Sequence, residues 1–262
     1  MNSFTLLTGA SSGIGWELAK IFAAHSENLI LVARSKEALE KLAAEIRSTH
    51  KVSVEVIALD LSLETAPEEL AKICQQRNLR VENFVNNAGF GDNAVFATSS
   101  WKKQAEMMDL NMKSLVHLTH LFLPDMLARK KGGILNTAST AAFQPGPFMA
   151  VYYATKAFVL SFSEALNEEL RGTGVHVTAL CPGPTLSGFQ KAAGMDSSLL
   201  FKMKVPGSLE VAEYGYKAFV AKKPVAVHGL LNKFLALSTR FTPRFLMVKV
   251  VRRLQEKRLN RT

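Results

Sequence analysis

The segment FTLLTGASSGIG, residues 4–15, joins a short apolar run to a glycine-rich turn, and it decides the fold. Residues 4–8 are predicted to form a buried strand, and residues 15–25 carry apolar side chains at helical spacing. Three glycines occupy the turn: Gly9, Gly13 and Gly15. Such a turn lets backbone N–H groups approach a pyrophosphate at a helix N-terminus. The spacing G-x-x-x-G-x-G differs from the commoner G-x-G-x-x-G, so a plain glycine turn stays open as an alternative.

Short apolar runs alternate with helical patterns along the rest of the chain. Further strands are predicted at 28–33, 52–59, 83–89, 132–139, 175–183 and 224–227. Helices are predicted at 36–48, 64–77, 101–130 (one helix or two), 150–172 and near 208–222. Seven strands alternating with helices imply an α/β fold: a seven-stranded parallel sheet with helices on both faces, in the doubly wound, Rossmann-type arrangement. Ligands in this fold bind beyond the carboxyl ends of the strands.

No linker or internal repeat divides the 262 residues, so we expect a single domain. Residues 1–228 are assigned to the Rossmann-type domain, including a substrate loop at 186–207. Residues 229–262 are assigned to a basic, amphipathic helical extension of the same domain.

The net charge of +10 is unevenly distributed. Residues 1–221 contain 21 Lys/Arg and 21 Asp/Glu, whereas residues 222–262 contain 11 Lys/Arg and a single acid, Glu256. A neutral domain with a basic end, without a basic-aromatic groove pattern, argues against nucleic-acid binding.

The two cysteines and the lengths of the apolar runs indicate the cellular compartment in which the protein is expected. Cys74 and Cys181 lie in unrelated contexts, so neither a disulfide nor a metal site is expected, and their use fits a reducing compartment. The N-terminus lacks the features of a signal peptide, and no apolar run reaches the roughly 18–20 residues of a membrane-spanning helix. We therefore expect a cytoplasmic protein, with peripheral membrane contact only through its tail.

The end of the second predicted strand bears on the choice of cofactor. In a dinucleotide-binding fold an acid about 20 residues after the glycines holds the ribose 2′-hydroxyl of NAD, whereas an arginine accommodates the 2′-phosphate of NADP. Arg34 follows Gly15 by 19 residues, and no acid appears before Glu37. A guanidinium can pair bidentately with a phosphate that a carboxylate would repel. This pattern predicts NADPH/NADP, with a solvated loop arginine as the alternative.

The segment VYYATK, residues 151–156, contains a candidate acid–base pair. Tyr152 and Tyr153 precede Lys156 by four and three residues, and both spacings share the lysine's helix face. Local spacing therefore leaves two candidate tyrosines.

The motifs taken in order resemble the classical short-chain dehydrogenase/reductase family. They are the glycine turn, NNAG at 86–89, Asn111, Ser139, Tyr152-x-x-x-Lys156 and PGPT at 182–185, and the likeness runs from about residue 3 to about 228. The family places its serine about 13 residues before its tyrosine, as Ser139 precedes Tyr152, so Tyr153 is expected to pack as a neighbour. Many relatives carry threonine where this chain has Ser187, which departs from the pattern.

The resemblance implies an oxidoreductase that interconverts a ketone or aldehyde and an alcohol. Tyr152 would exchange a proton with the substrate oxygen, and Ser139 would hydrogen-bond that oxygen. A free tyrosine is a poor base because its pKa lies near 10, and a lysine ammonium nearby favours the phenolate. Lys156 would therefore lower the tyrosine pKa and also hold the nicotinamide ribose. Asn111 would hold a proton-relaying water, and Asn86 would tie strands together.

The cofactor contacts follow from the same resemblance, joined by Arg34. They are Gly9, Ser11, Ser12, Gly13, Ile14, Gly15, Arg34, Asp60, Leu61, Asn87, Ala88, Gly89, Tyr152, Lys156, Pro182, Gly183 and Thr185. A nucleotide-binding regulator without catalysis is the alternative, but the intact set of Asn111, Ser139, Tyr152 and Lys156 argues against it.

Two loops predicted above the strands are unusually apolar. Residues 141–152 carry Phe143, Phe148 and Met149, and residues 187–207 carry Phe189, Met195, Leu199, Leu200, Phe201 and Met203. Apolar walls suit a hydrophobic, acyl- or steroid-like carbonyl compound, although these side chains could instead pack on the core or a partner subunit. We expect a homo-oligomer, either a dimer or a tetramer.

The tail at 242–262 is predicted to begin a helix, with Thr242 as N-cap and Pro243 at the first position. Its apolar face would hold Met247, Val250, Val251 and Leu254, and its charged face Lys249, Arg252, Arg253 and Glu256. Such a helix could lie on a membrane and lead a peripheral membrane-binding protein. Packing on the chain's own domain or on a partner, with a solvated basic face, is the favoured interpretation.

Overall fold

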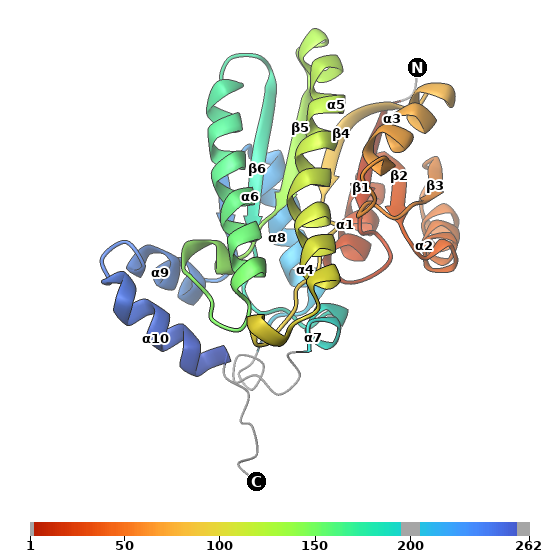
Figure 1. The fold of residues 1–262 in the computed structure, drawn as a ribbon. Helices are drawn as coiled ribbons and strands as arrows, with labels where there is room; N and C mark the ends of the chain where they lie inside the picture. Colours follow the sequence, from red (N-terminus) through yellow and green to blue (C-terminus); the bar gives the residue numbers. More distant parts are fainter. Residues whose placement is uncertain (1–2, 195–204, 256–262) are drawn as a thin grey trace.

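A computed structural model describes residues 3–194 and 205–255, and a seven-stranded parallel sheet forms its centre (Figure 1). The strands are β1 (Ser3–Thr8), β2 (Asn28–Ala33), β3 (Val54–Ala58), β4 (Arg80–Asn86), β5 (Gly132–Thr137), β6 (Val175–Cys181) and β7 (Val225–Val227). Their order is β3-β2-β1-β4-β5-β6-β7, and all neighbours run parallel. The predicted fold class is therefore confirmed. The largest shift in bounds is at β4, which begins and ends three residues earlier than expected.

Most helices lie where helical periodicity predicts them. The helices are α1 (Gly13–Ala24), α2 (Lys36–Thr49), α3 (Ala66–Gln76), α4 (Trp101–Met108), α5 (Leu115–Ala128), α6 (Ala150–Glu169), α7 (Gly188–Ala192), α8 (Ser208–Val220), α9 (Leu230–Ser238) and α10 (Arg244–Gln255). The short α7 falls within the predicted substrate loop, and α9 was not predicted separately. A π-helical segment, η2 (Asp109–Ser114), joins α4 to α5, so the region expected as one helix or two is one continuous helical stretch with an irregular centre. A short 3-10 turn, η3 (Thr140–Phe143), follows β5.

Successive side chains of the central strands point to opposite faces of the sheet and pack in two hydrophobic layers. Leu7 of β1 packs with α1, α2 and α8, whereas its neighbour Leu6 packs in the layer that includes α3 and α5. Both leucines are fully buried. This alternation is what a sheet covered on both faces requires, and each such side chain contributes about 1.5–3 kcal/mol of burial free energy. The strands consequently carry near-continuous apolar runs.

The C-terminal helices lie at one edge of the molecule, below α6 in Figure 1. Helix α10 begins at Arg244, one residue later than the predicted cap would place it. The Pro243 carbonyl accepts the amide of Met247 at 3.2 Å, while the Thr242 hydroxyl donates to Ser238 O at 2.9 Å. The N-cap prediction for Thr242 was therefore wrong, because its hydroxyl closes the turn after α9.

The predicted apolar face of the tail is divided by the structure. Val251 is buried and Met247 packs beside it, but Val250 is 54% exposed and Leu254 is also exposed. The inward face instead continues to Gln255, which is buried and stands four residues after Val251. Glu256 lies outside the described residues. None of the helices within residues 3–194 and 205–255 combines the length and the apolarity needed to cross a bilayer.

The strand order reverses direction between β1 and β4, because the chain returns from β3 to β4 on the other side of β1. In an open parallel sheet the loops on either side of such a switch point diverge and leave a crevice at the carboxyl ends of the strands. The loops after β1, β4 and β5 meet at this edge, and they carry most of the residues that the sequence selects.

Candidate active site

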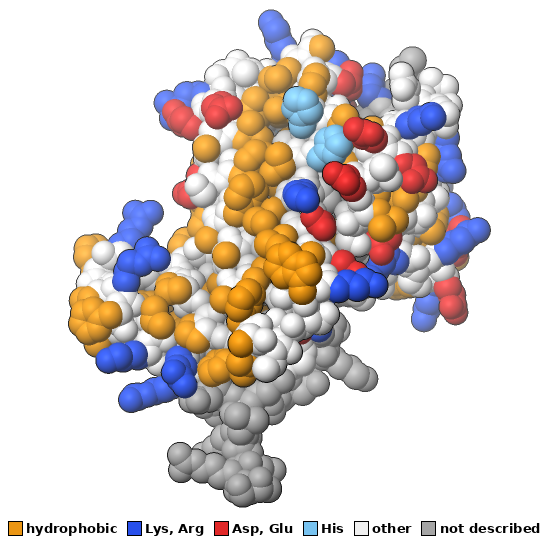
Figure 2. Space-filling view, in the orientation of Figure 1, with side chains coloured by type: hydrophobic (Ala, Val, Ile, Leu, Met, Phe, Trp, Pro, Cys, Tyr) orange, Lys and Arg blue, Asp and Glu red, His pale blue; other side chains and the backbone are white. Residues whose placement is uncertain are grey.

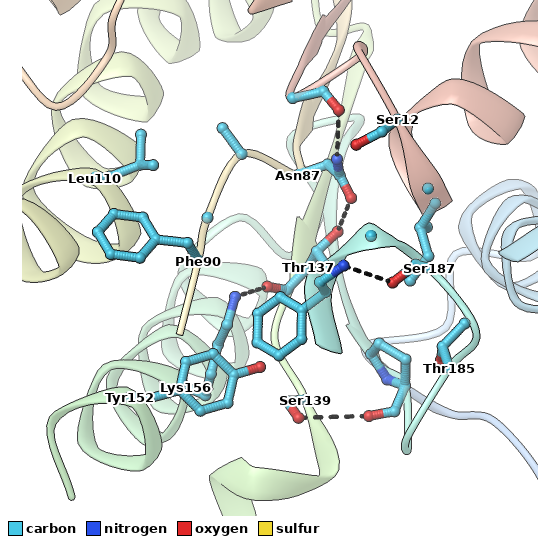
Figure 3. A pocket seen from close by; sticks show the side chains of 18 of the residues that line it. Ser12, Asn87, Phe90, Leu110, Thr137, Ser139, Tyr152, Lys156, Thr185 and Ser187 are labelled. Carbon is cyan, nitrogen blue, oxygen red and sulfur yellow. Dashed lines mark hydrogen bonds between the residues drawn. The ribbon is translucent and has the colours of Figure 1, made fainter. Parts of the chain in front are cut away.

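A pocket of about 700 Å³ lies at the carboxyl ends of the strands (Figure 3). Every predicted cofactor residue except Gly15 lines it. Ser139, Tyr152 and Lys156 line it as well, whereas Asn111 does not. The structure thus brings together residues that are spread over more than 170 positions of the chain.

The glycine turn has the backbone conformation that a phosphate cradle needs. Gly9 and Gly13 have φ angles of +67° and +60°, a backbone conformation that residues other than glycine rarely adopt. A Cβ at Gly9 would lie 2.8 Å from Ala88 Cα, and one at Gly15 would lie 2.2 Å from Gly9 O. Gly15 therefore allows close packing of α1 against the turn, which explains why it does not line the pocket.

The N-terminus of α1 opens directly onto this turn. Ser12 is the N-cap, and its side chain makes no capping hydrogen bond. The first amides of a helix lack intrahelical acceptors and carry the positive end of the helix dipole, so they bind anions such as a pyrophosphate. The turn and the pocket therefore fit a dinucleotide.

A hydrogen-bond network braces the turn against β4 and β5. The Thr8 hydroxyl accepts the amides of Asn87 (3.0 Å) and Ala88 (3.1 Å), and Asn87 Nδ2 donates to Gly9 O at 3.2 Å. The Thr137 hydroxyl in turn donates to Asn87 Oδ1 at 3.3 Å (Figure 3). Asn86, on the strand itself, donates to Asn136 Oδ1 of β5 at 3.0 Å.

Arg34 and Asp60 face each other at the rim of the pocket. Arg34 follows β2, its side chain is 77% exposed, and its Nη1 lies 4.0 Å from Asp60 Oδ2. The other carboxylate oxygen, Oδ1, accepts the amide and the hydroxyl of Ser62 at 3.0 and 2.7 Å. Asp60 is held in place, while the guanidinium remains on the exposed rim, where it can turn toward an anionic group.

Tyr152 and Lys156 stand one helical turn apart on α6, and both are buried. Burial raises the pKa of Tyr152 well above its usual value of 10, and a hydrogen bond with Ser139 opposes part of this increase. Burial lowers the pKa of Lys156 to about 8. The lysine Nζ donates to Thr137 O at 2.7 Å and lies 5.9 Å from the centroid of the Tyr152 ring.

These directions correct the expectation that Lys156 lowers the tyrosine pKa. The lysine directs its ammonium to a backbone carbonyl, so the loss of hydration around the phenol dominates. In this arrangement the Tyr152 hydroxyl keeps its proton at neutral pH and is a hydrogen-bond donor into the pocket.

Ser139 sits where β5 ends and η3 begins. Its Oγ accepts the amide of Ala141 at 3.1 Å and donates to Pro182 O at 3.4 Å. Figure 3 shows this hydroxyl below the Tyr152 ring, on the same side of the pocket. The Tyr152 and Ser139 hydroxyl groups can therefore hydrogen-bond the same oxygen atom of a bound molecule.

Asn111 lies in the π-helical segment η2 and is buried. Its Oδ1 accepts the amide of Phe90 at 3.1 Å, while Nδ2 donates to Phe90 O (3.0 Å) and to Thr155 Oγ1 (3.1 Å). Its side chain braces the loop after β4 from behind the pocket wall. A Cβ at Gly89 would lie 2.9 Å from Asn111 Oδ1 and 3.5 Å from Lys156 Nζ, so Asn111 and the lysine flank the same backbone. Its role as a water holder stays a prediction.

Apolar side chains form the wall opposite the glycine turn. Phe90, Leu110, Met149 and Phe189 line the pocket, and the Phe189 ring centroid is 5.4 Å from that of Tyr152. Two predicted wall residues, Phe143 and Phe148, do not line it. Phe148 has a φ angle of +65° and lies against the Arg252 guanidinium instead. The remaining predicted residues, Met195, Leu199, Leu200, Phe201 and Met203, lie outside the described residues.

The PGPT segment and its neighbour complete the floor of the pocket. The Thr185 hydroxyl donates to Gly183 O at 2.9 Å. Ser187 also lines the pocket, and its hydroxyl accepts the amide of Phe189 at 3.3 Å. The serine that replaces the family's usual threonine therefore still presents a hydroxyl here.

Sequence reasoning missed a contact between the C-terminal helix and the pocket. Gln255 of α10 lines the pocket, and its Nε2 donates to the Tyr153 hydroxyl at 2.6 Å. Its Oε1 accepts from Asn93 Nδ2 at 3.4 Å. Tyr153, expected only to pack, therefore also lines the pocket. No sequence signal connects residues 102 positions apart.

Comparison with known proteins agrees with this geometry. A model of the short chain dehydrogenase family matches residues 3–197. The chain is 36% identical over 181 residues to a very-long-chain 3-oxoacyl-CoA reductase of Phaeosphaeria nodorum, covering 67% of this chain and 52% of that protein. It is 34% identical over 185 residues to a 17-beta-hydroxysteroid dehydrogenase type 3 of Rattus norvegicus, covering 70% and 60%. The aligned regions thus span little more than half of these relatives.

Solved structures extend the likeness over most of the chain. A short-chain dehydrogenase from Sphingobium yanoikuyae in complex with NADPH superposes with a TM-score of 0.82 at 31% identity, covering 91% of this chain and 93% of the other. A short-chain dehydrogenase/reductase from Burkholderia phymatum in complex with NAD gives a TM-score of 0.78 at 25% identity, covering 91% and 92%. The family uses NAD(P), with both forms among these neighbours.

A Rossmann-type dinucleotide fold with a buried tyrosine–lysine pair defines the class of protein. The chain belongs to the short chain dehydrogenase family.

Proposed function

We propose that the chain is an NADPH-dependent reductase that interconverts a hydrophobic ketone or aldehyde and its alcohol. The observation that carries this proposal is the position of Tyr152, which lines the same pocket as Ser139 and packs its ring against Phe189. A carbonyl oxygen bound there would accept from the Tyr152 hydroxyl and would replace Pro182 O as the acceptor of the Ser139 hydroxyl, while the rest of the substrate lies against apolar side chains. The printed names of the relatives, a 3-oxoacyl-CoA reductase and a hydroxysteroid dehydrogenase, are consistent with acyl- or steroid-like carbonyl compounds.

The chain's own residues supply the proton and its route. A reduced nicotinamide, when bound, supplies a hydride to the carbonyl carbon. Tyr152 donates its proton to the oxygen, and Ser139 polarises the carbonyl by a hydrogen bond. Lys156, whose pKa lies near 8, is mostly charged at pH 7 and can return a proton toward the phenolate. Met149 and Phe189 form an apolar wall beside Tyr152 against which a hydrophobic substrate can pack.

The preference for NADPH is proposed from Arg34. Its exposed guanidinium stands at the rim after β2, next to Ser35, whose hydroxyl caps α2 at 3.2 Å from Ala38 N. A 2′-phosphate placed between them would gain a charge-assisted hydrogen bond that a 2′-hydroxyl cannot match. Asp60 is the only acid that lines the pocket in the described part of the chain, and the pairing with Arg34 offsets its charge.

We also propose that residues 1–228 and the 229–262 extension act as one domain. Val251 packs in the cluster that contains Tyr152, and Gln255 lines the pocket, so the extension supports the site directly. The homo-oligomer and the cytoplasmic location remain predictions. Light scattering on the purified chain measures the first, and fractionation of cells measures the second.

A comparison of two adjacent tyrosine variants tests the function. Tyr152→Phe should abolish NADPH consumption with a panel of bulky ketones, β-ketoacyl esters and steroid ketones, while NADPH still binds. Tyr153→Phe is the matched control, because it loses a hydroxyl on the same helix that contacts Gln255. It should retain turnover within about tenfold. Equal activity of Tyr152→Phe and the wild type would refute the role of Tyr152, and a wild type inactive on the whole panel would refute the substrate class.

A further inference from the structure

The outer faces of α9, α10 and the turn between them form an exposed apolar surface, which we call the α9–α10 surface. It consists of Leu230, Leu231, Phe234, Leu235, Leu237, Phe241, Phe245, Leu246 and Val250. Leu230 and Phe241 are more than 80% exposed, and Phe234 is 67% exposed. Half of the large, exposed hydrophobic side chains in the described residues thus fall within about 20 consecutive positions. A folded domain seldom leaves such an apolar patch exposed unless it contacts a partner or a membrane.

The opposite face of the same segment is fixed to the domain. Ala236 of α9 and Val251 of α10 are buried, and Gln255 ends α10 inside the pocket wall. Asn232 Nδ2 donates to His228 O at 2.8 Å, which ties α9 to the segment after β7. The two helices therefore hold the apolar surface on a firm base, and the exposed side chains have no place in the core.

Basic residues surround this surface, and acids are absent from it. Residues 229–255 contain Lys233, Arg240, Arg244, Lys249, Arg252 and Arg253 and no Asp or Glu. All six basic side chains are exposed. Figure 2 shows the corresponding lobe at the lower left, where hydrophobic and basic side chains alternate and no acidic side chain is visible in this view. Phenylalanine and leucine ringed by Lys and Arg are the composition of a helix that lies in a lipid interface.

We propose that the α9–α10 surface binds the surface of an anionic lipid bilayer. The apolar side chains enter the boundary between headgroups and acyl chains, and Arg240, Arg244, Lys249 and Arg253 contact anionic headgroups. A second copy of the chain is a poorer occupant, because a symmetric contact would set this all-basic surface against itself without a compensating acid. Charge complementarity therefore favours an anionic bilayer over a second copy of the chain as the partner of this surface.

This docking would bring the membrane next to the pocket. Gln255, at the end of α10, lines the pocket together with Tyr153, so the helix that carries the lipid-facing side chains also forms part of the pocket wall. A hydrophobic compound dissolved in the bilayer would have a short path to that wall. The binding proposal itself is independent of the enzymatic activity, and its test measures lipid binding alone.

Vesicle co-sedimentation of the full-length chain tests the proposal. The vesicles are phosphatidylcholine alone, or phosphatidylcholine with about 30 mol% phosphatidylserine, at low salt and at about 0.5 M NaCl. The wild type should bind the anionic vesicles at least about tenfold more strongly than the neutral ones, and high salt should weaken that binding. Phe234→Ser/Phe241→Ser and Arg240→Glu/Arg244→Glu should each reduce binding to anionic vesicles by at least about tenfold.

Two double variants elsewhere serve as matched controls. Leu63→Ser/Val220→Ser removes exposed apolar side chains from other elements, and Lys51→Glu/Lys72→Glu reverses exposed charges away from the surface. Both should bind vesicles like the wild type, and thermal unfolding checks that all four variants are folded. Equal sedimentation of the wild type with and without anionic vesicles would overturn the proposal. A second result would also overturn the proposal. If vesicles capture no protein, and light scattering shows a wild-type dimer that the Phe234→Ser/Phe241→Ser variant dissociates, the surface joins two copies of the chain.

Discussion

Replacing Lys156 with methionine should stabilise the protein while removing its activity. Burial lowers the pKa of Lys156 from its ordinary value of 10.5 to about 8 in the folded protein. A difference of about 2.5 between the folded and unfolded pKa corresponds to about 3 kcal/mol of destabilisation at pH 7, where both states must hold the charge. The lost hydrogen bond to Thr137 O offsets about 1 kcal/mol of the gain. We therefore expect Lys156→Met to raise the free energy of unfolding by about 2 kcal/mol at pH 7.

The stability difference between Lys156→Met and the wild type should change with pH in a defined direction. Between about pH 8 and pH 10.5 the unfolded chain retains the lysine proton while the folded chain has lost it, so the wild-type stability rises with pH across that window. The variant lacks this contribution. The stability advantage of Lys156→Met should therefore be largest below pH 8, shrink steadily above it, and vanish or reverse near pH 10.

Urea unfolding followed by circular dichroism at pH 7, 8, 9 and 10 measures both proteins. All other titrating groups are shared, so their effects cancel in the difference between the two. Lys72→Met, on the exposed face of α3, is the control and should show a small, pH-independent change. A Lys156→Met variant that is less stable than the wild type at pH 7, or a stability difference that stays constant up to pH 10, would refute the account of a buried ammonium.

Two further predictions concern the rim and the far wall of the pocket. Arg34→Asp should weaken NADPH binding about 10- to 100-fold and change NADH binding much less, because only NADPH loses a charge-assisted contact; fluorescence titration measures both, and equal losses would contradict the assignment. Lys36→Asp, adjacent but outside the pocket lining, is its control. Gln255→Ala should cost about 1–2 kcal/mol of stability by leaving the Tyr153 hydroxyl without its donor. It should also raise KM for a bulky carbonyl substrate more than the Kd for NADPH, and unchanged values would exclude α10 from the substrate site.

The sequence alone was enough for the fold and most of the site lining. Apolar runs of strand length alternating with helical periodicity leave few topologies open, since crossovers must be right-handed and both sheet faces covered. The glycines at 9 and 13 needed no structure to be singled out, because a positive φ and a close backbone approach exclude other residues. Motifs at strand ends come together in one pocket because the carboxyl ends of parallel strands lie at the same edge of the sheet.

Tertiary structure decided which environment each side chain has. Spacing could not separate Tyr152 from Tyr153, because both share a helix face with Lys156. The fold places Tyr152 in the pocket lining beside Ser139, whereas the Tyr153 hydroxyl accepts a hydrogen bond from Gln255 Nε2. Burial, a property of the whole fold, also reversed the expected direction of the tyrosine pKa, because the Lys156 ammonium is bound to a carbonyl and the phenol has lost its hydration.

The C-terminal helix shows the same division. Helical periodicity predicted an amphipathic helix with a basic face, and that helix exists. Its sequence could not say which apolar residues face inward, because Val250 and Val251 are equally apolar neighbours. Packing against the cluster around Tyr152 chose Val251 and Gln255 and left Val250 exposed. The spacing of apolar and basic residues therefore determined that α10 is amphipathic, whereas only the docking of α10 on the domain determined which side chains remain at the surface.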